Sequence, residues 1–422
     1  MMRKTALFLA ALAALHVAPA RAQLDGNFVE AQVAPYRLPD PLVMGDGTAV
    51  RTAQQWWKLR RPELVGLFER NIYGISPARP THMRFVVTET SANALGGIAV
   101  RKQVTIYLDG TSGGPQMSVL IYLPAGARAP MPMFVGPNFH GNQSVSADPE
   151  IAITPNWVTP AEGINKNRAT LHARGTDASE WPIERILKAG YGVATYFTGD
   201  LYPDGDTQYA QSIQPWYRTS PSAPDHWGAV ATWAWGLSRV YDYLATDRAV
   251  DAKRVIVMGH SRYGKAALWA GARDTRFAAV ISNDSGEGGA SLYRRNFGET
   301  IRVMNNYWFA PNYKTFSERE AELPVDAHEL IALVAPRPVY IGAASEDLWA
   351  DPLGMFLAAK AAEPVYRLLG VEGMAGDAMP APGQAILSRI SYHLRMGPHG
   401  ITAWDWDNYI RFANRFLPQR PR

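Results

Sequence analysis

The segment that decides the fold is Arg254-Val-Ile-Val-Met-Gly-His-Ser-Arg-Tyr-Gly-Lys265. Its first half is a short apolar run typical of a buried strand, and the residues after it are typical of a helix. Gly259 and Gly264 flank Ser261, as expected where a strand packs closely on the following helix. We interpret the segment as a nucleophile elbow, which presents the Ser261 hydroxyl at the carboxyl edge of a sheet. The alternative is an ordinary strand–helix turn, because the second glycine lies one residue later than in G-x-S-x-G.

Strands and helices are expected to alternate around this segment. Short apolar runs predict strands at 133–135, 190–197, 254–258, 278–282 and 338–343, and the stretches 52–71 and 226–244 are typical of helices. This alternation predicts an α/β fold with a mostly parallel sheet and right-handed crossovers. Alternating patterns at 83–89, 99–108 and 117–123 predict an antiparallel N-terminal lead-in. We expect three layers, with helices on both faces.

Composition supports one globular domain. The 422 residues are 47% hydrophobic and 19% charged, which excludes a disordered or fibrous chain. No linker is evident, so we expect a single domain over 23–422 that begins with a wrapping arm at 23–48. The polar stretch 142–179 is too long for an ordinary connection and is predicted to be an insertion near the mouth of the sheet. The chain has no cysteine, which excludes disulfides, thiolate metal sites and cysteine nucleophiles.

Residues 1–22 have the pattern of an export signal. Arg3 and Lys4 precede an apolar run at 6–17, and Ala20-Arg21-Ala22 resembles a cleavage site. The run is shorter than the ~18 residues of a membrane span. We therefore expect an exported protein, periplasmic or secreted, with no membrane contact after cleavage. Losing these residues reduces the 42 basic residues by three to 39, against 38 acidic ones, so no nucleic-acid partner is expected.

The proposed nucleophile requires a histidine and an acid later in the chain. The histidines after Ser261 are His328, His393 and His399. His399 lies in a Gly-Pro-His-Gly loop that can present its ring, whereas His393 is expected inside a strand and His328 in a core or surface position. His399 is therefore the predicted general base.

Two aspartates compete for the third position. Asp284 follows the strand expected at 278–282, and Asp347 follows the next strand, the usual place in this kind of fold. A capping or loop position for either is the alternative. We favour a shared task, in which both hold His399.

The elbow G-x-S-R-x-G-K resembles that of glucuronoyl esterases of bacterial type, carbohydrate esterase family 15, which are α/β-hydrolases. The resemblance extends over roughly residues 50–415. It rests also on these stretches: Thr198-Gly199-Asp200, Pro203-Asp204, Asn283-Asp284-Ser285-Gly286, Arg294-Arg295, Glu346-Asp347-Leu348-Trp349 and Arg395-Met396-Gly397-Pro398-His399. It implies a secreted serine esterase that cleaves the ester between (4-O-methyl-)glucuronic acid of xylan and lignin alcohols through an acyl-enzyme on Ser261. It also implies that Asp284 occupies the family's acid position, where Glu is more common.

Substrate-side residues follow the nucleophile. The backbone N–H and the guanidinium of Arg262 are placed to stabilise an oxyanion, and Lys265 lies one helical turn beyond Ser261. Two cations there suit an ester whose acid half is polar and becomes anionic on cleavage. The resemblance implies that Arg262, Lys265, Glu299 and Trp349 surround the sugar. The turn at 140–141 is a second candidate oxyanion donor.

No cofactor is expected, and no metal, because His140 and His172 lack neighbours at ligand spacing. The expected partners are glucuronoxylan and lignin–carbohydrate esters, and the expected state is a monomer. The alternatives are an acetylxylan esterase or another carboxylesterase on the same fold, and a non-catalytic carbohydrate-binding protein. A small apolar acetyl pocket fits poorly with Arg262, Lys265 and Glu299, and the serine, acid and histidine in order argue against a binding protein.

Overall fold

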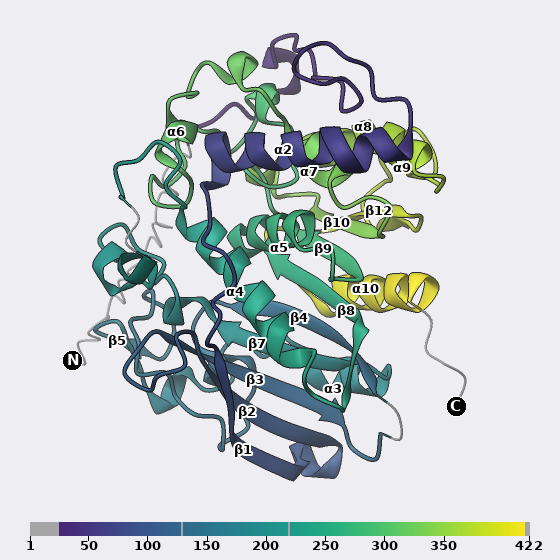
Figure 1. Ribbon diagram of the computed structural model, residues 1–422. Helices are drawn as coiled ribbons and strands as arrows, with labels where there is room; N and C mark the ends of the chain where they lie inside the picture. The colour runs from purple at the N-terminus through teal and green to yellow at the C-terminus, as the bar shows by residue number, and fades with distance from the viewer. Residues whose placement is uncertain (1–24, 128–129, 218–219, 418–422) are drawn as a thin grey trace, which may run out of the picture.

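A single large sheet organises the chain. The computed structural model describes residues 25–127, 130–217 and 220–417, within which ten strands form this sheet in the order β1-β2-β3-β7-β4-β8-β9-β10-β12-β11 (Figure 1). Strands β7, β4, β8, β9, β10 and β12 run parallel to one another. Antiparallel strands flank them, with β1–β3 at one edge and β11 at the other. The strands are β1 Arg84–Ala94, β2 Ala99–Tyr107, β3 Gln116–Pro124, β4 Met131–Asn138, β7 Gly192–Phe197, β8 Val250–His260, β9 Ala279–Asn283, β10 Val339–Ala344, β11 Gln384–Ile386 and β12 Ile390–Arg395.

Helices cover both faces of this sheet, which gives three layers. One cluster of buried apolar side chains joins one face of the sheet to α4, α5, α7, α8 and α9. Helix α2 packs against the outer side of α7. The other joins the opposite face to α3 and α10. The helices are α1 Ala53–Gln55, α2 Arg61–Phe68, α3 Ile183–Lys188, α4 Ala229–Leu244, α5 Arg262–Arg273, α6 Pro311–Lys314, α7 Ala327–Ala332, α8 Pro352–Ala361, α9 Glu363–Leu368 and α10 Ala403–Phe416. The expected α/β-hydrolase architecture with an antiparallel lead-in is confirmed.

Several element boundaries differ from those predicted. Strand β1 ends at Ala94 rather than at 89, and β8 begins at Val250 rather than at 254. The strand expected at 133–135 continues to Asn138, because β7 pairs with β4 that far. The long helix was expected from residue 226 and begins at Ala229 instead. Gly228 before it is extended, and a Cβ there would lie 2.3 Å from the Trp308 carbonyl oxygen, so the chain enters the helix through a close backbone contact.

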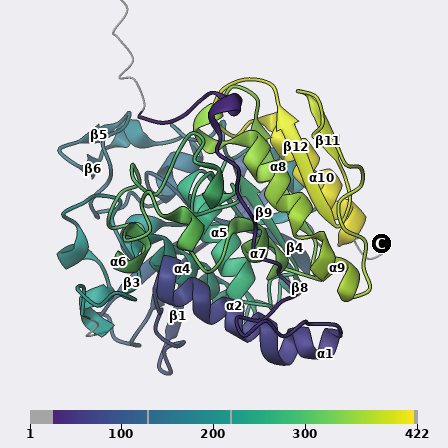
Figure 2. The ribbon, with the colours of Figure 1, turned by 90° about the horizontal axis from the view of Figure 1, so that it is seen from above.

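Two long irregular segments lie over the sheet. Residues 139–182 connect β4 to α3 and contain only short elements, among them the hairpin β5 Ile164–Asn165 and β6 Arg168–Ala169. The N-terminal segment from residue 25 crosses the molecule before it reaches α1 (Figure 2). The predicted export signal at 1–22 lies outside the described residues. Within those residues, no helix has the length and apolar character needed to cross a membrane.

Candidate active site

Ser261 lies at the tip of a sharp turn between β8 and α5. Its backbone has φ 58° and ψ −133°, a conformation that non-glycine residues rarely adopt. Its N–H donates to the Asn283 carbonyl at 2.8 Å, which fixes the turn to the neighbouring strand. A Cβ at Gly259 would lie 2.0 Å from the Tyr263 carbonyl oxygen, so the glycine expected there is required by close packing. The backbone has the geometry of a nucleophile elbow.

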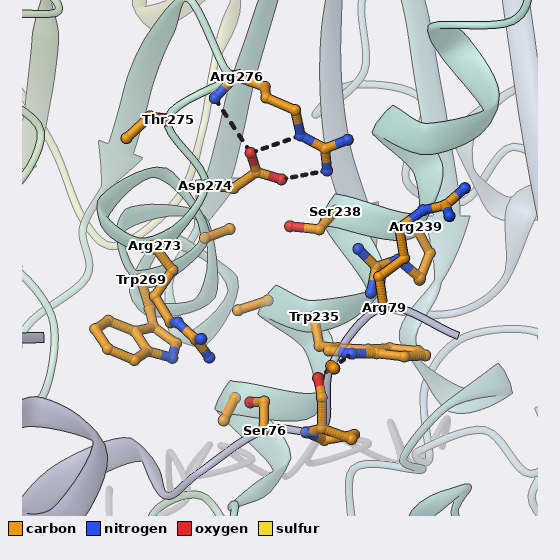
Figure 3. A pocket seen from close by; sticks show the side chains of 15 residues that line it. Ser76, Arg79, Trp235, Ser238, Arg239, Trp269, Arg273, Asp274, Thr275 and Arg276 are labelled. Atoms are coloured by element: carbon orange, nitrogen blue, oxygen red, sulfur yellow. Dashed lines mark hydrogen bonds and ion pairs between the residues drawn. The ribbon is translucent and has the colours of Figure 1, made fainter. Parts of the chain in front are cut away.

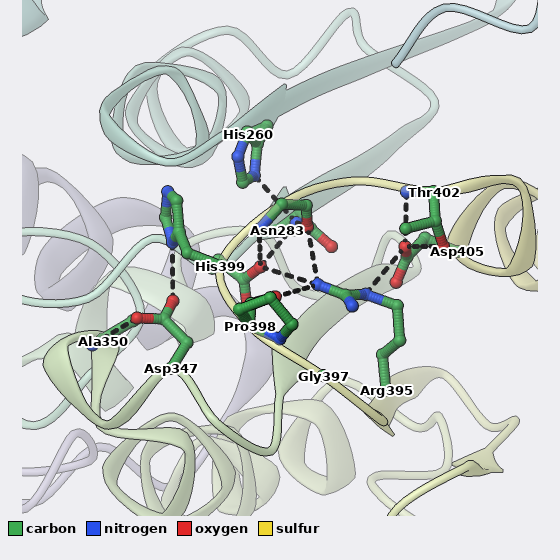
Figure 4. A network of polar contacts seen from close by, with 12 residues as sticks. His260, Asn283, Asp347, Ala350, Arg395, Gly397, Pro398, His399, Thr402 and Asp405 are labelled. Carbon is green, nitrogen blue, oxygen red and sulfur yellow. Dashed lines mark hydrogen bonds and ion pairs between the residues drawn. The ribbon is translucent and has the colours of Figure 1, made fainter. Parts of the chain in front are cut away.

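His399 is held by a direct contact with Asp347. Its Nδ1 lies 2.6 Å from Asp347 Oδ2. Figure 4 shows the His399 ring directed toward this carboxylate. Burial lowers the pKa of His399, but the hydrogen bond and the charge of Asp347 outweigh burial and leave the pKa raised. With Nδ1 donating to Asp347, Nε2 is left to accept a proton. Among the described residues, no hydrogen bond joins Ser261 Oγ to His399. Catalytic hydrogen bonds are often long or poorly aligned in structures without substrate.

The second predicted acid lies beside this pair in a different environment. Asp284 is 2% exposed, and its Oδ1 has no partner among the described residues. Its Oδ2 accepts a long bond, 3.4 Å, from the Gly400 N–H. Burial, followed by the nearby charge of Asp347, raises the pKa of Asp284 to about 7. Both candidate acids therefore reach the histidine loop, but only Asp347 hydrogen-bonds the His399 ring directly.

These three side chains also form the group among the described residues whose ligand atoms lie close enough for a metal ion. One atom each from Asp284, Asp347 and His399 lies within 4.8 Å of the others. The 2.6 Å contact between His399 and Asp347 already uses the ring nitrogen that would face such an ion. We therefore interpret the group as a hydrogen-bonded catalytic cluster.

Asn283 and Arg395 form hydrogen bonds with the loop that carries His399. Asn283 Nδ2 lies 2.9 Å from His260 Nδ1 and donates to the Gly400 carbonyl at 3.1 Å. Arg395 donates to the Pro398 carbonyl at 2.6 Å and to that of Gly400 at 3.1 Å. Both residues stood in the quoted stretches, but no task had been predicted for either. The histidine loop is thus fastened on both sides of residue 399.

The two cations expected near the nucleophile are each paired with a carboxylate. Arg262 Nε donates to Asp204 Oδ2 at 2.5 Å, and Lys265 Nζ donates to Glu299 Oε2 at 2.6 Å. The Trp308 ring lies under both, 5.5 Å from the Arg262 guanidinium and 5.7 Å from Lys265 Nζ. The site therefore presents a hydrogen-bonding surface in which each of the two cations expected from the sequence has a carboxylate partner.

The predicted sugar-side residues gather in one place. The Glu299 N–H donates to the Trp349 carbonyl at 2.7 Å, which joins the two loops that carry these side chains. Lys265 is 2% exposed and also donates to the Glu287 carbonyl at 2.6 Å. Trp349 itself is half-buried and packs near Phe28, with ring centroids 6.3 Å apart.

The turn after β4 lies against the elbow, as expected for a second oxyanion donor. The Phe139 ring packs on Tyr263 with centroids 4.3 Å apart. His140 Nδ1 contacts Asp177 Oδ2 at 2.9 Å.

His393 is buried inside β12, as predicted, and lies 3.0 Å from an Asp405 oxygen. His328 is buried and bound to the Pro39 carbonyl, so it belongs to the core alternative.

Asp204, Tyr307 and Trp308 were not predicted as site residues. Tyr307 and Trp308 both donate to Asp204 Oδ1, at 2.6 and 3.0 Å. These two bonds hold the Asp204 carboxylate in place, and its other oxygen accepts from Arg262 Nε. The Pro203-Asp204 stretch was part of the resemblance and was the available signal for Asp204. The sequence contains no comparable signal for Tyr307 and Trp308.

This geometry defines a serine hydrolase of the α/β-hydrolase fold, and known proteins agree with it. A family model described as glucuronyl esterase, fungi, matches residues 177–370. Carbohydrate esterase MZ0003, from an unknown prokaryotic organism, is 48% identical over 93% of this chain and 92% of its own length. The structure of a promiscuous CE15 esterase from a marine bacterial metagenome superposes with a TM-score of 0.88 at 48% identity, covering 93% of this chain and 100% of that one. A glucuronoyl esterase from Solibacter usitatus gives 0.86 at 42% identity, covering 91% and 99%.

The chain belongs to carbohydrate esterase family 15, the glucuronoyl esterases. It is a carboxylic ester hydrolase, which excludes the non-catalytic binding protein considered from sequence.

Proposed function

We propose that the protein hydrolyses the ester between (4-O-methyl-)glucuronic acid of xylan and a lignin alcohol, with Ser261 as nucleophile. The observation that carries this proposal is the elbow of Ser261 beside the His399–Asp347 pair, with Lys265 and Glu299 paired one helical turn away. A paired ammonium and carboxylate offer donors and acceptors to sugar hydroxyls. A small apolar acetyl pocket would need neither.

The reaction would proceed in two halves. Ser261 Oγ attacks the ester carbonyl while His399 Nε2 takes the hydroxyl proton. His399 then donates this proton to the leaving alcohol, and the glucuronoyl group stays on Ser261. Water then attacks the acyl group while the same nitrogen takes its proton, and His399 returns this proton to Ser261 Oγ as the uronic acid leaves. Asp347 holds the ring in the required tautomer and stabilises its cation.

The negative charge that develops on the ester carbonyl oxygen would be stabilised at the start of α5. The Arg262 N–H is the first of this helix, where developing negative charge is stabilised. The Arg262 side chain is held by Asp204 through Nε, which leaves its terminal nitrogens for the substrate.

The test compares two substrates in three proteins. Benzyl D-glucuronate should be cleaved much faster than p-nitrophenyl acetate by the wild type. Ser261→Ala should abolish both activities, whereas Ser220→Ala, a change at an exposed serine, should alter neither. More than a few per cent of activity in Ser261→Ala would overturn the mechanism. Equal turnover of the two substrates would favour a general carboxylesterase or acetylxylan esterase.

We also propose that the mature protein is exported and acts as one domain from residue 23. The pattern of residues 1–22 supports the export, and intact mass measurement of the protein from its periplasm or medium would test it. A mass that still includes residues 1–22 would contradict the proposal.

A further inference from the structure

An arginine-lined cavity lies at the far end of α5 from the nucleophile. It has a volume of about 390 Å³ and is lined by residues 76–79, α4 and the end of α5 with the turn after it. Ser261 precedes the first residue of this 12-residue helix, and Arg273 is its last. On α5 the lining of the cavity begins at Trp269, eight residues after Ser261, so at about 1.5 Å per residue the cavity lies roughly 12 Å or more along the helix from the nucleophile and is separate from the ester site.

Four arginines surround this cavity, and they outnumber the carboxylates that pair with them. Asp242 accepts from Arg79 at 3.0 Å, Arg239 at 2.8 Å and Arg276 at 2.7 Å. Asp274 is bound by Arg276 through Nε and Nη2, at 2.9 and 2.7 Å. Arg273 pairs with Glu69 at 3.0 Å. Four guanidinium groups therefore face three carboxylates, which leaves one positive charge uncompensated.

The buried cation of this group has free hydrogen-bonding capacity. The Arg239 side chain is only 6% exposed, and its Nε bond to Asp242 is its one hydrogen bond among the described residues. A guanidinium has five N–H donors, so most of those on Arg239 are unused. Its planar group lies over the Trp235 ring, 4.8 Å from the centroid, which holds it in place. The terminal nitrogens of Arg239 are not sealed from solvent, so an anion that enters the cavity can reach them.

Ser238 also lines the cavity. Figure 3 shows its hydroxyl on the side of Asp274, away from Arg239, and this hydroxyl hydrogen-bonds the Asp274 carboxylate. Arg276 binds both oxygens of the same carboxylate. The guanidinium groups are therefore the donors that the lining offers to a ligand, and guanidinium groups recognise carboxylate and sulfate groups.

We propose that this cavity is a second ligand site, which binds a small oxyanion such as a carboxylate or a sulfate. The uncompensated positive charge favours an anion over a neutral ligand. The oxyanion can come from a free inorganic ion or from an acidic sugar, and the two sources differ in what else enters the cavity. The inference does not depend on the proposed ester chemistry.

The experiment follows the Trp235 indole N–H by NMR in the mature protein, with the resonance assigned by Trp235→Phe. Sodium sulfate and sodium D-glucuronate are titrated at constant ionic strength, with D-glucose and sodium chloride as controls. We expect a saturable shift with at least one oxyanion and none with the controls. Shifts with both oxyanions identify a site for the anionic group alone, and a shift with glucuronate only identifies the acidic sugar as the source.

Variants separate binding from folding. Arg239→Gln should weaken binding at least fivefold. This change also removes a buried partner of Asp242. Arg79→Gln removes a partner of the same carboxylate, but one that is half-exposed, so it is a milder second variant that should weaken binding while leaving ester hydrolysis unchanged. Arg84→Gln, on β1 and outside the cavity lining, should leave binding unchanged. No saturable shift, an equal shift with D-glucose, or full affinity in both Arg239→Gln and Arg79→Gln would overturn the proposal.

Discussion

Two aspartates beside His399 differ in environment although their side chains are identical. Asp347 Oδ2 accepts a hydrogen bond from His399 Nδ1 at 2.6 Å. Asp284 is sealed from solvent, with a raised pKa of about 7 and an oxygen without a partner among the described residues. Because orienting an imidazolium requires a strong, direct acceptor, we assign the larger share of this task to Asp347 and a supporting, longer-range charge to Asp284.

The matched variants Asp347→Asn and Asp284→Asn test this division. Asp347→Asn should lower kcat by about 10² to 10⁴-fold, because the amide no longer holds the required tautomer. Asp284→Asn should lower kcat by about tenfold or less. The measurement is kcat on benzyl D-glucuronate, with circular dichroism to check folding. Similar losses in both single variants and a non-additive double variant would instead support the equal sharing favoured from sequence.

Asp284 should also make stability depend on pH. Its pKa is about 7 in the folded protein and near 3.8 in an unfolded chain, so the folded state holds the extra proton between these values. Stability from this group is complete below about pH 4 and is lost as pH rises through 7. In Asp284→Asn this loss disappears. The free energy of unfolding of Asp284→Asn relative to wild type should therefore rise by up to about 4 kcal/mol from pH 4 to pH 8.

Urea unfolding of both proteins at several pH values provides the measurement. Groups that titrate equally in both proteins cancel in the difference. A difference that stays constant over this range would mean that Asp284 is ionised throughout, and its pKa would then have to be near the ordinary value.

At this scale the sequence predicts some residues and not others for physical reasons. Ser261 and His399 follow from local motifs and chain order. The choice between Asp284 and Asp347 depends on where two side chains point after neighbouring strands, which no spacing encodes. Asp204 meets Arg262 across 58 residues of chain, so only the fold brings the two together.

Among the larger elements, the N-terminal arm is joined to both loops that carry the sugar-side residues. The Asn27 carbonyl accepts from the Gly298 N–H at 2.8 Å, next to Glu299. The Phe28 ring lies 6.3 Å from that of Trp349. Glu30 pairs with Arg295 at 2.6 Å. Sequence reasoning predicted a wrapping arm, but these contacts over more than 260 residues could not be seen in a Pro- and Gly-rich stretch.

Phe28→Ala should therefore affect sugar binding more than chemistry. Loss of one aromatic contact is worth about 0.5–1.5 kcal/mol, so KM for benzyl D-glucuronate should rise by roughly two- to tenfold with kcat nearly unchanged. Hydrolysis of p-nitrophenyl acetate, which has no sugar, should stay within twofold of wild type. Val29→Ala, at an exposed neighbouring position, is the control. Equal effects on both substrates would show that the arm acts through general stability.

Secondary structure was predicted more fully than the site. Buried parallel strands such as β8 and β10 are continuous apolar runs bounded by turn residues, so they are visible in the sequence. Their ends are not, because β4 continues through Gly136 and Pro137 only where β7 provides partners. The irregular segment 139–182 has no such pattern, and its course depends on contacts such as Arg174 with the Asp148 and Ile151 carbonyls.

Over the whole molecule, the contacts cross every boundary at which two domains could separate. The sheet continues from β1 to β11, and one apolar cluster joins the early helix α2 to the late helices α8 and α9. The buried ion pair between Arg60 and Glu329, 2.7 Å long, ties the N-terminal helical segment to α7. Arg101 on β2 reaches Asp148 in the segment after β4 at 2.5 Å. We therefore expect the lead-in, the insertion and the core to unfold together.

Calorimetry of residues 23–422 should show one transition, at a temperature that does not change over a hundredfold range of protein concentration, as expected for a single-domain monomer. The inactive Ser261→Ala variant should unfold in the same single step, because the change removes only a hydroxyl from a half-buried turn residue. Arg60→Met leaves Glu329 buried with no partner for its charge, so the whole transition should move to lower temperature without splitting. A separate early transition would reveal an independent unit, and a transition temperature that rises with concentration would reveal an oligomer.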